Sequence, residues 1–334
     1  MIEFTSVSKR YADGQPAVDD LSMQIPAGKI TVLVGPSGCG KTTTLRMINR
    51  MVEPTSGTIA IDGADIADST PATLRRGIGY VIQHAGLFPH RTIADNIATV
   101  PRLTGMSRRR AREEALALMD RVGLDRSLAT RYPAQLSGGQ QQRVGVARAL
   151  AADPPILLMD EPFSAVDPVV RDSLQQELLD LQSEVGKTIV FVTHDIDEAI
   201  LLGDRIAVMA VGGRLAQLAT PSDLLSSPAD DFVRGFIGRD RGIRALSFAH
   251  PHGLPSSPPA GWEVVSDEGR PSAWRAPDGS TRRLDGVVRP GDSTRRALDL
   301  ALLSPNGHAV CVDESGAYAG TLTRAALVEE RSDG

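Results

Sequence analysis

The sequence contains few cysteines and no long apolar run. Its two cysteines, Cys39 and Cys311, lie far apart in the 334 residues and lack metal-ligand spacing, which excludes a disulfide scaffold and a cysteine metal site. No segment approaches the roughly 18 consecutive apolar residues that cross a bilayer. Met1–Thr5 has no apolar segment of a secretion signal. We therefore expect the protein to reside in the reducing cytoplasm. Any association with a membrane would come only through a partner protein.

An excess of positive charge is also lacking. The net charge is −5 and the isoelectric point is about 5.7, so we predict no nucleic-acid partner. The one basic run, Arg108–Arg110 with Arg112, is followed at once by Glu113 and Glu114, and we interpret it as a solvated helix face.

Short apolar runs separated by helical stretches predict an α/β fold. The expected buried strands are residues 29–34, 77–82, 156–159, 188–192 and 205–209. Such strands between helices are typical of a parallel sheet that is covered on both faces. Antiparallel strands are expected in residues 1–27 and 57–63. A helical insertion is expected over about 86–153. We predict one domain over 1–238 and a second over 239–334.

A glycine-rich loop follows the first of these buried strands. Gly35–Thr42 reads Gly-Pro-Ser-Gly-Cys-Gly-Lys-Thr and fits G-x-x-x-x-G-K-[ST], with helical composition from Thr42 to Met51. Between a strand and a helix, this pattern predicts a site for nucleotide phosphates. The glycines let amides approach, Lys41 offers a charge to the β and γ oxygens, and the Thr42 hydroxyl binds Mg²⁺. The sequence therefore predicts ATP and Mg²⁺ as cofactors.

Two further segments supply a second anion site and a carboxylate pair. Leu136–Gln140 (Leu-Ser-Gly-Gly-Gln) runs into a helical pattern, so its serine and glycines present a helix N-terminus that favours anions. The apolar strand Ile156–Met159 ends in Asp160 and Glu161. We expect Asp160 to hold Mg²⁺ through water and Glu161 to act as general base on the attacking water. The alternative for this pair is a helix cap.

Three single residues stand at positions where they can serve the same site. Gln83 ends one buried strand, where it can touch the metal or the water; on its own it is a surface or capping residue. His194 ends another strand and can hydrogen-bond the γ-phosphate, or it is a structural histidine. Tyr11 precedes an Asp-Gly turn and either stacks on adenine or packs in the core.

These segments, in this order, resemble the ATPase subunits of ABC transporters over about residues 1–240. Gly35–Thr42 is similar to Walker A, Leu136–Gln140 to the signature motif, and Ile156–Glu161 to Walker B. Ser164–Asp167 resembles the D-loop, and Gln83, His194 and Tyr11 resemble the Q-loop, switch histidine and A-loop. The resemblance implies a P-loop (RecA-like) ABC core with an antiparallel β subdomain and a helical insertion.

The resemblance also implies roles for individual residues and a head-to-tail dimer. In that family, Walker A of one subunit and the signature loop of a second copy close on the same ATP. The implied catalytic residues are Glu161, His194 and Gln83, and the implied metal-site residues are Thr42, Gln83 and Asp160. The implied nucleotide contacts are Tyr11, Gly35, Pro36, Ser37, Gly38, Cys39, Gly40, Lys41, Thr42, Thr43, Ser137, Gly138, Gly139, Gln140 and Asp167.

A finer resemblance concerns the osmoprotectant branch of importers. It is carried by Gly86–Ile97, Met47–Met51 and Glu53–Gly57. That branch takes up glycine betaine, choline and carnitine, which implies separate integral membrane permease subunits and, indirectly, a solute-binding protein. The implied location is peripheral, at the cytoplasmic face of the plasma (inner) membrane. Gln83 and the helical insertion would pass movement to the membrane partner, a gating role.

Two rival functions remain open at this stage. One is an importer of the same class with another small polar cargo, such as amino acids, because the ATPase does not touch cargo. The other is a non-transport nucleotide clamp acting on DNA or ribosomes. Against the clamp, the interval between the two phosphate loops is one compact block without sustained heptads.

The C-terminal residues contain a weak internal repeat. Gly261–Gly269 matches Gly307–Gly316, and both copies predict a strand, an acidic turn and a second strand. The repeat resembles the tandem CBS pair that follows the ATPase in several osmoprotectant importers, including Gly320–Thr323. The first copy ends at Trp274 without a clear Gly-x-x-Thr/Ser. We predict a small α+β, degenerate tandem CBS-like module; a free-standing ligand sensor is the alternative.

Overall fold

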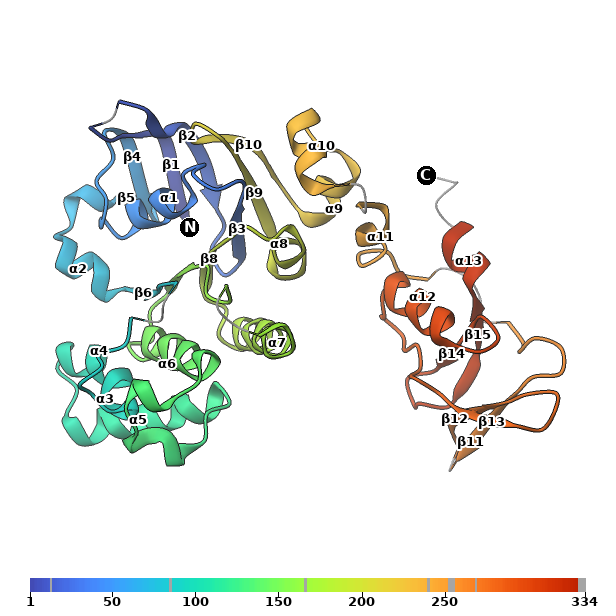
Figure 1. The fold of residues 1–334 in the computed structure, drawn as a ribbon. Coiled ribbons are helices and arrows are strands. Elements are labelled where there is room, and N and C mark those ends of the chain that lie inside the picture. The colour runs from blue at the N-terminus through green and yellow to red at the C-terminus, as the bar shows by residue number, and fades with distance from the viewer. Residues whose placement is uncertain are drawn as a thin grey trace. The chain divides into compact units, whose positions relative to one another are not determined.

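The computed structural model describes residues 1–12, 14–83, 86–164, 167–238, 241–251, 256–267 and 269–329 (Figure 1). The chain divides into two compact units, Met1–Phe236 and Ile237–Gly334. Each unit has its own buried apolar cluster. No helix among these residues is both long and apolar enough to span a membrane.

A six-stranded sheet forms the centre of the first unit. Its order is β10-β9-β3-β8-β7-β6, parallel except for the edge strand β10. Every residue of β3, β7 and β8 is buried, as expected for strands covered on both faces. The predicted buried strands are thereby confirmed. The bounds are β3 Ile30–Val34, β6 Ile78–Val81, β7 Ile156–Asp160, β8 Thr188–Thr193, β9 Arg205–Ala210 and β10 Arg214–Ala219.

A second, antiparallel sheet has the order β2-β1-β4-β5. Apolar residues of its strands alternate with exposed ones, and Ile2, Phe4 and Leu21 belong to the main core together with side chains of β3 and α1. The predicted antiparallel β subdomain is confirmed. The bounds are β1 Ile2–Arg10, β2 Pro16–Ile25, β4 Ser56–Ile61 and β5 Ala64–Asp65, and the helix after the P-loop is α1 Lys41–Ile48.

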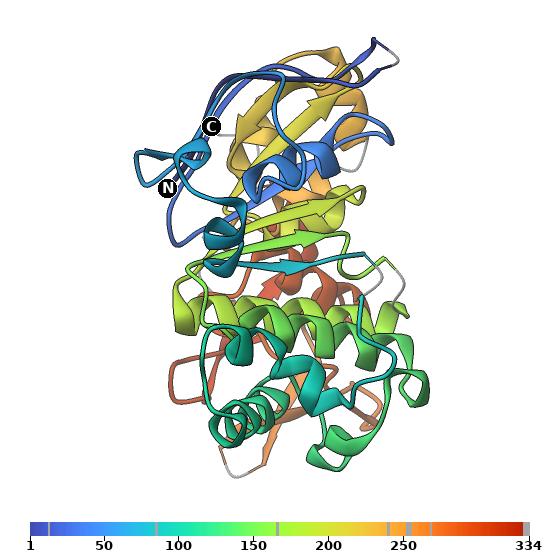
Figure 2. The same ribbon diagram turned by 90° about the vertical axis from the view of Figure 1, so that its left-hand side faces the viewer.

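The chain between β6 and β7 is helical, as predicted. Figure 2 shows this insertion below the strands of the central sheet, with the antiparallel sheet above them. The longest helix of this insertion, α5, begins at Arg108 because the Ser107 hydroxyl caps it by accepting the Arg110 amide. Arg109 pairs with Glu113 on a well-exposed face, so the basic run is a solvated face. The insertion helices are α3 Ile93–Ile97, α4 Thr99–Leu103, α5 Arg108–Arg121 and α6 Gly138–Leu150.

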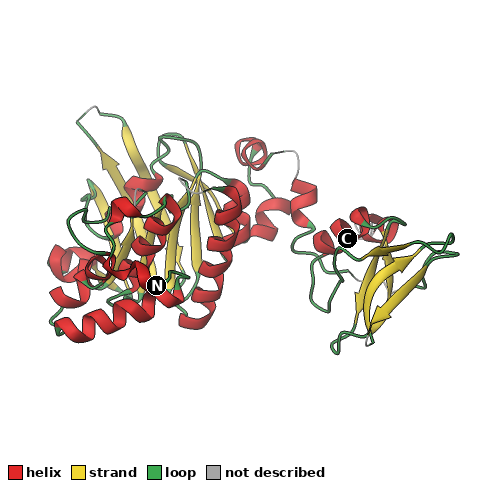
Figure 3. Cartoon of the chain, turned by 60° about the horizontal axis from the view of Figure 1, so that its bottom comes forward, coloured by secondary structure: helices red, strands yellow, loops and turns green. Residues whose placement is uncertain are grey.

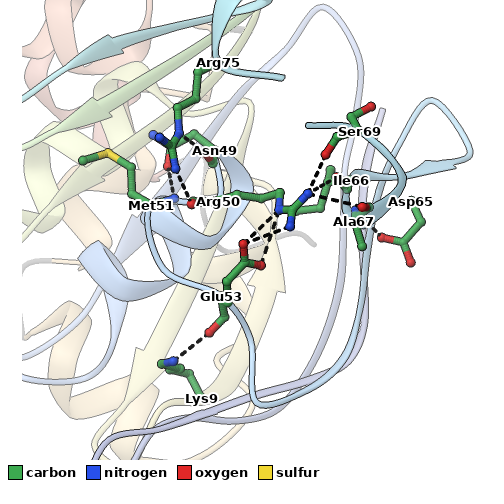
Figure 4. A network of polar contacts seen from close by, with 10 residues as sticks. All are labelled: Lys9, Asn49, Arg50, Met51, Glu53, Asp65, Ile66, Ala67, Ser69 and Arg75. Atoms are coloured by element: carbon green, nitrogen blue, oxygen red, sulfur yellow. Dashed lines mark hydrogen bonds and ion pairs between the residues drawn. The ribbon is translucent and has the colours of Figure 1, made fainter. Parts of the chain in front are cut away.

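A polar network fixes the end of α1, as Figure 4 shows. Arg50 follows this helix with a φ of 55°, and its guanidinium donates to the carbonyl oxygens of Ile66 and Ser69 and pairs with Glu53. Arg75, from α2 (Pro71–Arg76), donates to the Arg50 carbonyl at 2.6 Å. The P-loop helix is thereby tied to both the antiparallel subdomain and the segment that leads into β6.

The remaining helices of the first unit follow the strands in alternation. The helix α7 (Pro168–Val185) connects β7 to β8, and α8 (Ile196–Leu202) connects β8 to β9. Two short helices, α9 (Pro221–Ser226) and α10 (Asp231–Ile237), come after β10. Alternation of helices with parallel strands is the expected pattern of an α/β fold.

The second unit contains two hairpins, which the internal repeat predicts. Their surroundings differ: the first hairpin, β11–β12, continues into a third antiparallel strand, whereas the second, β14–β15, is preceded by α12 and followed by α13. Figure 3 shows the helices and strands of this unit. The two copies therefore share a hairpin but not a complete fold. The bounds are α11 Arg241–Ala245, β11 Glu263–Asp267, β12 Arg270–Arg275, β13 Thr281–Arg283, α12 Thr294–Leu303, β14 His308–Val312, β15 Tyr318–Thr323 and α13 Arg324–Glu329.

Candidate functional site

The loop Gly35–Thr42 joins β3 to α1, and its backbone requires glycine at both ends. A Cβ at Gly35 (φ 155°) would lie 2.3 Å from the Met209 carbonyl oxygen. A Cβ at Gly40 (φ 93°) would lie 2.1 Å from the Ala17 carbonyl oxygen. Gly40 is also the N-cap of α1 and supplies no side-chain cap, so first-turn amides of this helix are open to an anion.

Lys41 lies inside this loop. Its side chain is nearly buried, and its ammonium group donates to the carbonyl oxygens of Gly35 at 2.7 Å and Pro36 at 3.0 Å. The loop therefore holds a cation beside its own amides, the arrangement that binds a polyphosphate. Ser37 and Gly38 form its exposed tip. Burial raises the pKa of the Cys39 thiol, so this side chain is a neutral space-filler at neutral pH.

Thr42 and Asp160 meet where α1 begins and β7 ends. The Thr42 hydroxyl donates to Asp160 Oδ1 at 2.8 Å, and Asp160 is buried. Hydroxyl and carboxylate oxygens suit Mg²⁺, which nucleotide enzymes bind with one or two such groups and the substrate phosphates. No group of three or more His, Cys, Asp or Glu side chains able to hold a metal occurs within the described ranges. The residues fit a Mg²⁺ ion that arrives with a nucleotide.

Two of the side chains predicted to be catalytic, Gln83 and His194, converge on one carboxylate oxygen of the third, Glu161. Gln83 Nε2 donates to Glu161 Oε2 at 3.2 Å, and His194 Nδ1 lies 3.3 Å from the same oxygen. Glu161 adopts a left-handed φ of 46°, and its amide donates to the Val192 carbonyl on the adjacent strand. This fixed turn holds the carboxylate at the carboxyl end of the sheet, beside Asp160. A helix cap is not its role, because its partners are side chains from two other strand ends.

The signature loop opens α6 and lines a hollow of its own. The Ser137 hydroxyl accepts the Gln140 amide, and Gln140 Oε1 accepts the Ser137 amide at 3.0 Å, which forms a capping box. Ser137, Gly138, Gly139 and Gln140 line a hollow of about 540 Å³, and Asp167 lines it too. The predicted D-loop aspartate thus shares a surface with the signature residues. Ala165 and Val166 of the predicted D-loop lie outside the described residues.

Tyr11 does not pack in the core, which was the alternative to stacking on adenine. Its side chain is 46% exposed, and the Lys9 ammonium lies 5.2 Å from the centre of its ring. About half of the ring is thus accessible to a ligand, and the ring attracts a cation. Tyr11 therefore remains available for the predicted contact with adenine.

Sequence reasoning missed two residues that touch the predicted metal site. The Tyr80 hydroxyl lies 3.4 Å from Asp160 Oδ2, and Arg46 Nη2 lies 3.7 Å from the same oxygen. A signal was present: Tyr80 puts a hydroxyl into an otherwise apolar buried strand, and a phenol in such a place needs a polar partner.

A buried pair supports the helix that follows His194. Glu198 in α8 and Gln175 in α7 are both nearly inaccessible, and Gln175 Nε2 donates to Glu198 Oε1 at 3.0 Å. Asp195 caps α8 by accepting the amides of Asp197 and Glu198. The helix that follows His194 is therefore tied to α7 by the Gln175–Glu198 hydrogen bond and capped at its start by Asp195.

Glu198 gives a pH-dependent prediction. Burial raises its pKa above 4.5, opposed by hydrogen bonds from Thr193 and Gln175. Because the folded pKa lies above the unfolded one, this group's stabilising contribution is full below pH 4.5 and is lost as pH rises through the folded pKa. As the pH rises from 4.5 through the folded pKa of Glu198, we expect the melting temperature of the wild type to fall relative to that of Glu198→Gln. Thermal denaturation of both proteins, with the exposed-site change Glu113→Gln as control, measures this; parallel pH curves would contradict it.

Comparison with known proteins places this geometry in a family. Residues 18–164 match the family described as ABC transporter. The glycine betaine/proline betaine transport system ATP-binding protein ProV of Salmonella typhimurium is 39% identical over 352 residues, which cover 93% of this chain and 87% of ProV. This chain belongs to the ABC transporter ATP-binding proteins.

Two further similarities refine this assignment. The osmoprotectant import ATP-binding protein OsmV of Salmonella typhimurium is 53% identical over 251 residues, 74% of this ABC chain and 65% of OsmV. The match thus spans less than two thirds of that relative's length. A solved dimer of the ATP-binding cassette MJ0796, in a post-hydrolysis state with ADP and Pi, is 34% identical with a TM-score of 0.61. The superposition covers 66% of this chain and 99% of the cassette. This structural similarity confirms the predicted ABC ATPase fold.

Proposed function

We propose that this chain is the ATP-hydrolysing subunit of an ABC importer of quaternary-amine osmoprotectants. The observation that carries the ATPase role is the convergence of Gln83 and His194 on the Glu161 carboxylate, beside the P-loop. The cargo class is supported by the relatives: OsmV is named for osmoprotectants and ProV for glycine betaine and proline betaine.

ATP binding in this account uses the chain's own P-loop. The amides of Gly38–Thr43 and the Lys41 ammonium cradle the β- and γ-phosphates, and Tyr11 stacks on the adenine. Thr42 and Asp160, with Gln83 nearby, would hold Mg²⁺, which when bound neutralises charge on the phosphate oxygens. Lys41 exchanges the carbonyl oxygens of Gly35 and Pro36 for phosphate oxygens, so its charge stays compensated.

Hydrolysis then depends on Glu161. Its carboxylate accepts a proton from the attacking water, and Gln83 and His194 hold that carboxylate and the γ-phosphate in line. The signature residues Ser137–Gln140 lie around a separate hollow with Asp167. We propose that this hollow receives the γ-phosphate side of an ATP held by a second copy, so two chains close head to tail on the nucleotide.

The remaining partners follow from the importer class. Integral membrane permease subunits would receive the helical insertion, with a solute-binding protein acting on them from the other side, and the chain would sit peripherally at the cytoplasmic face of the plasma membrane. We also propose that residues 239–334 form a degenerate CBS-like module. The β14–β15 hairpin flanked by α12 and α13 supports one CBS-like half, and the β11–β12–β13 arrangement departs from the other.

Uptake measured in cells tests the proposed cargo. The chain is co-expressed with the permease and binding protein encoded beside it, and uptake of radiolabelled glycine betaine, choline and carnitine is compared with that of amino acids. We expect uptake of the quaternary amines only, and only with an active Glu161. Uptake of amino acids alone would contradict the proposed cargo class. ATP hydrolysis without uptake of any of these solutes would contradict the proposed transport function.

A further inference from the structure

Both oxygens of the Asp160 carboxylate are engaged, and by different elements. Oδ1 accepts the Thr42 hydroxyl at 2.8 Å. Oδ2 faces the Tyr80 hydroxyl at 3.4 Å and Arg46 Nη2 at 3.7 Å. Because the Asp160 side chain is only 6% exposed, water supplies little of its solvation. Its orientation is therefore set by these three side chains.

The geometry of the three elements explains why these residues meet. Thr42 and Arg46 are four residues apart on α1, so they share one face of the helix. Tyr80 on β6 is the register partner of Leu158 on β7, and Asp160 lies two residues further along the same face of that strand. The helix face and the strand pair thus bring the groups to the two sides of one carboxylate.

Arg46 also determines how the Tyr80 hydroxyl points. Its Nε–H donates to the Tyr80 oxygen at 3.4 Å, so this oxygen is used as an acceptor. The hydroxyl proton is then directed at Asp160 Oδ2.

We propose that Tyr80 is a positioning residue that, oriented by Arg46, holds the Asp160 carboxylate in the orientation in which it would bind the Mg²⁺ of a nucleotide. The proposal rests on the proposed ATPase function. Partners of this kind fix ligand orientation, and their loss typically costs about 10- to 100-fold in metal affinity or activity. The hydrogen bond is long, so we expect an effect near the lower limit, about tenfold.

The experiment measures metal dependence rather than turnover. Binding of ADP to the full chain is titrated calorimetrically at increasing Mg²⁺ for wild type, Tyr80→Phe and the control Tyr132→Phe, which removes an exposed hydroxyl from the helical insertion. We expect Tyr80→Phe to raise the half-saturating Mg²⁺ concentration about tenfold. ADP affinity in EDTA and the melting temperature should match those of Tyr132→Phe.

A double-mutant cycle shows whether Tyr80 acts through Asp160. Asp160→Asn should raise the Mg²⁺ requirement by itself, and adding Tyr80→Phe should then change nothing further. An unchanged Mg²⁺ requirement in Tyr80→Phe, or an equal shift in the Asp160→Asn background, overturns the inference. Failure of wild type to bind ADP would instead overturn the proposed function, so the two failures are distinguishable.

Discussion

Replacing Glu161 with Gln is expected to lower the ATP turnover of this chain by about 10²- to 10⁴-fold, the range ascribed to general-base catalysis. The change keeps the size of the side chain and an acceptor oxygen for Gln83 Nε2, which lies 3.2 Å from the carboxylate in the wild type. It removes the group that accepts the proton of the attacking water. ATP binding should be retained, because the P-loop contacts come from other elements.

The measurement separates binding from chemistry. Equilibrium binding of ATP and single-turnover hydrolysis are compared for wild type, Glu161→Gln and the control Glu113→Gln, which neutralises an exposed carboxylate paired with Arg109. We expect similar ATP affinity in all three proteins and slow hydrolysis in Glu161→Gln alone. Undiminished hydrolysis by Glu161→Gln would show that Glu161 is not the general base.

The second large effect is expected at Gly139. Gly139 lies in the first turn of α6 and lines the hollow shared with Asp167. An aspartate there puts a carboxylate where an incoming γ-phosphate would meet the helix N-terminus, and like charges at such a distance repel strongly. Gly139→Asp should therefore reduce steady-state hydrolysis by at least about 100-fold, comparable to the loss of an electrostatic contact to the transition state.

The same substitution should leave the chain's own nucleotide site intact. Gly139 belongs to the helical insertion, whereas the Gly35–Thr42 loop is built on β3 and α1. The matched control is Gly235→Asp, at an exposed helical glycine with nothing within 4 Å of an added Cβ. We expect ATP binding to be equal in both variants and hydrolysis to be lost only in Gly139→Asp. Loss of ATP binding in Gly139→Asp would show that the loop acts within its own chain.

The sequence was most informative where a strand ends in polar residues. Asp160, Glu161 and His194 each follow a run of buried apolar residues, and carboxyl ends of parallel strands share one edge of the sheet. The approach of Glu161 to His194 and Gln83 was therefore predictable without coordinates. The P-loop was predictable because glycine, lysine and threonine occur there at fixed spacing between a strand and a helix.

Other features depended on tertiary contacts that no local pattern encodes. Tyr80 meets Asp160 only through the register of β6 and β7, and the sequence does not state which strands are neighbours. Arg50 binds carbonyl oxygens of residues 66–69, so its role depends on where a separate segment passes. The repeat in the second unit predicted two hairpins, but not that one continues into β13 and the other is flanked by helices.

The central claim is that an ATP held by one copy is completed by the signature loop of a second copy. Light scattering on size-exclusion chromatography, with and without ATP, tests it most directly on Glu161→Gln and on Glu161→Gln combined with Gly139→Asp. The account predicts that ATP converts the single variant to a dimer, whereas the combined variant binds ATP and stays monomeric. A dimer that forms equally well in the combined variant, or a single variant that stays monomeric with ATP bound, would contradict it.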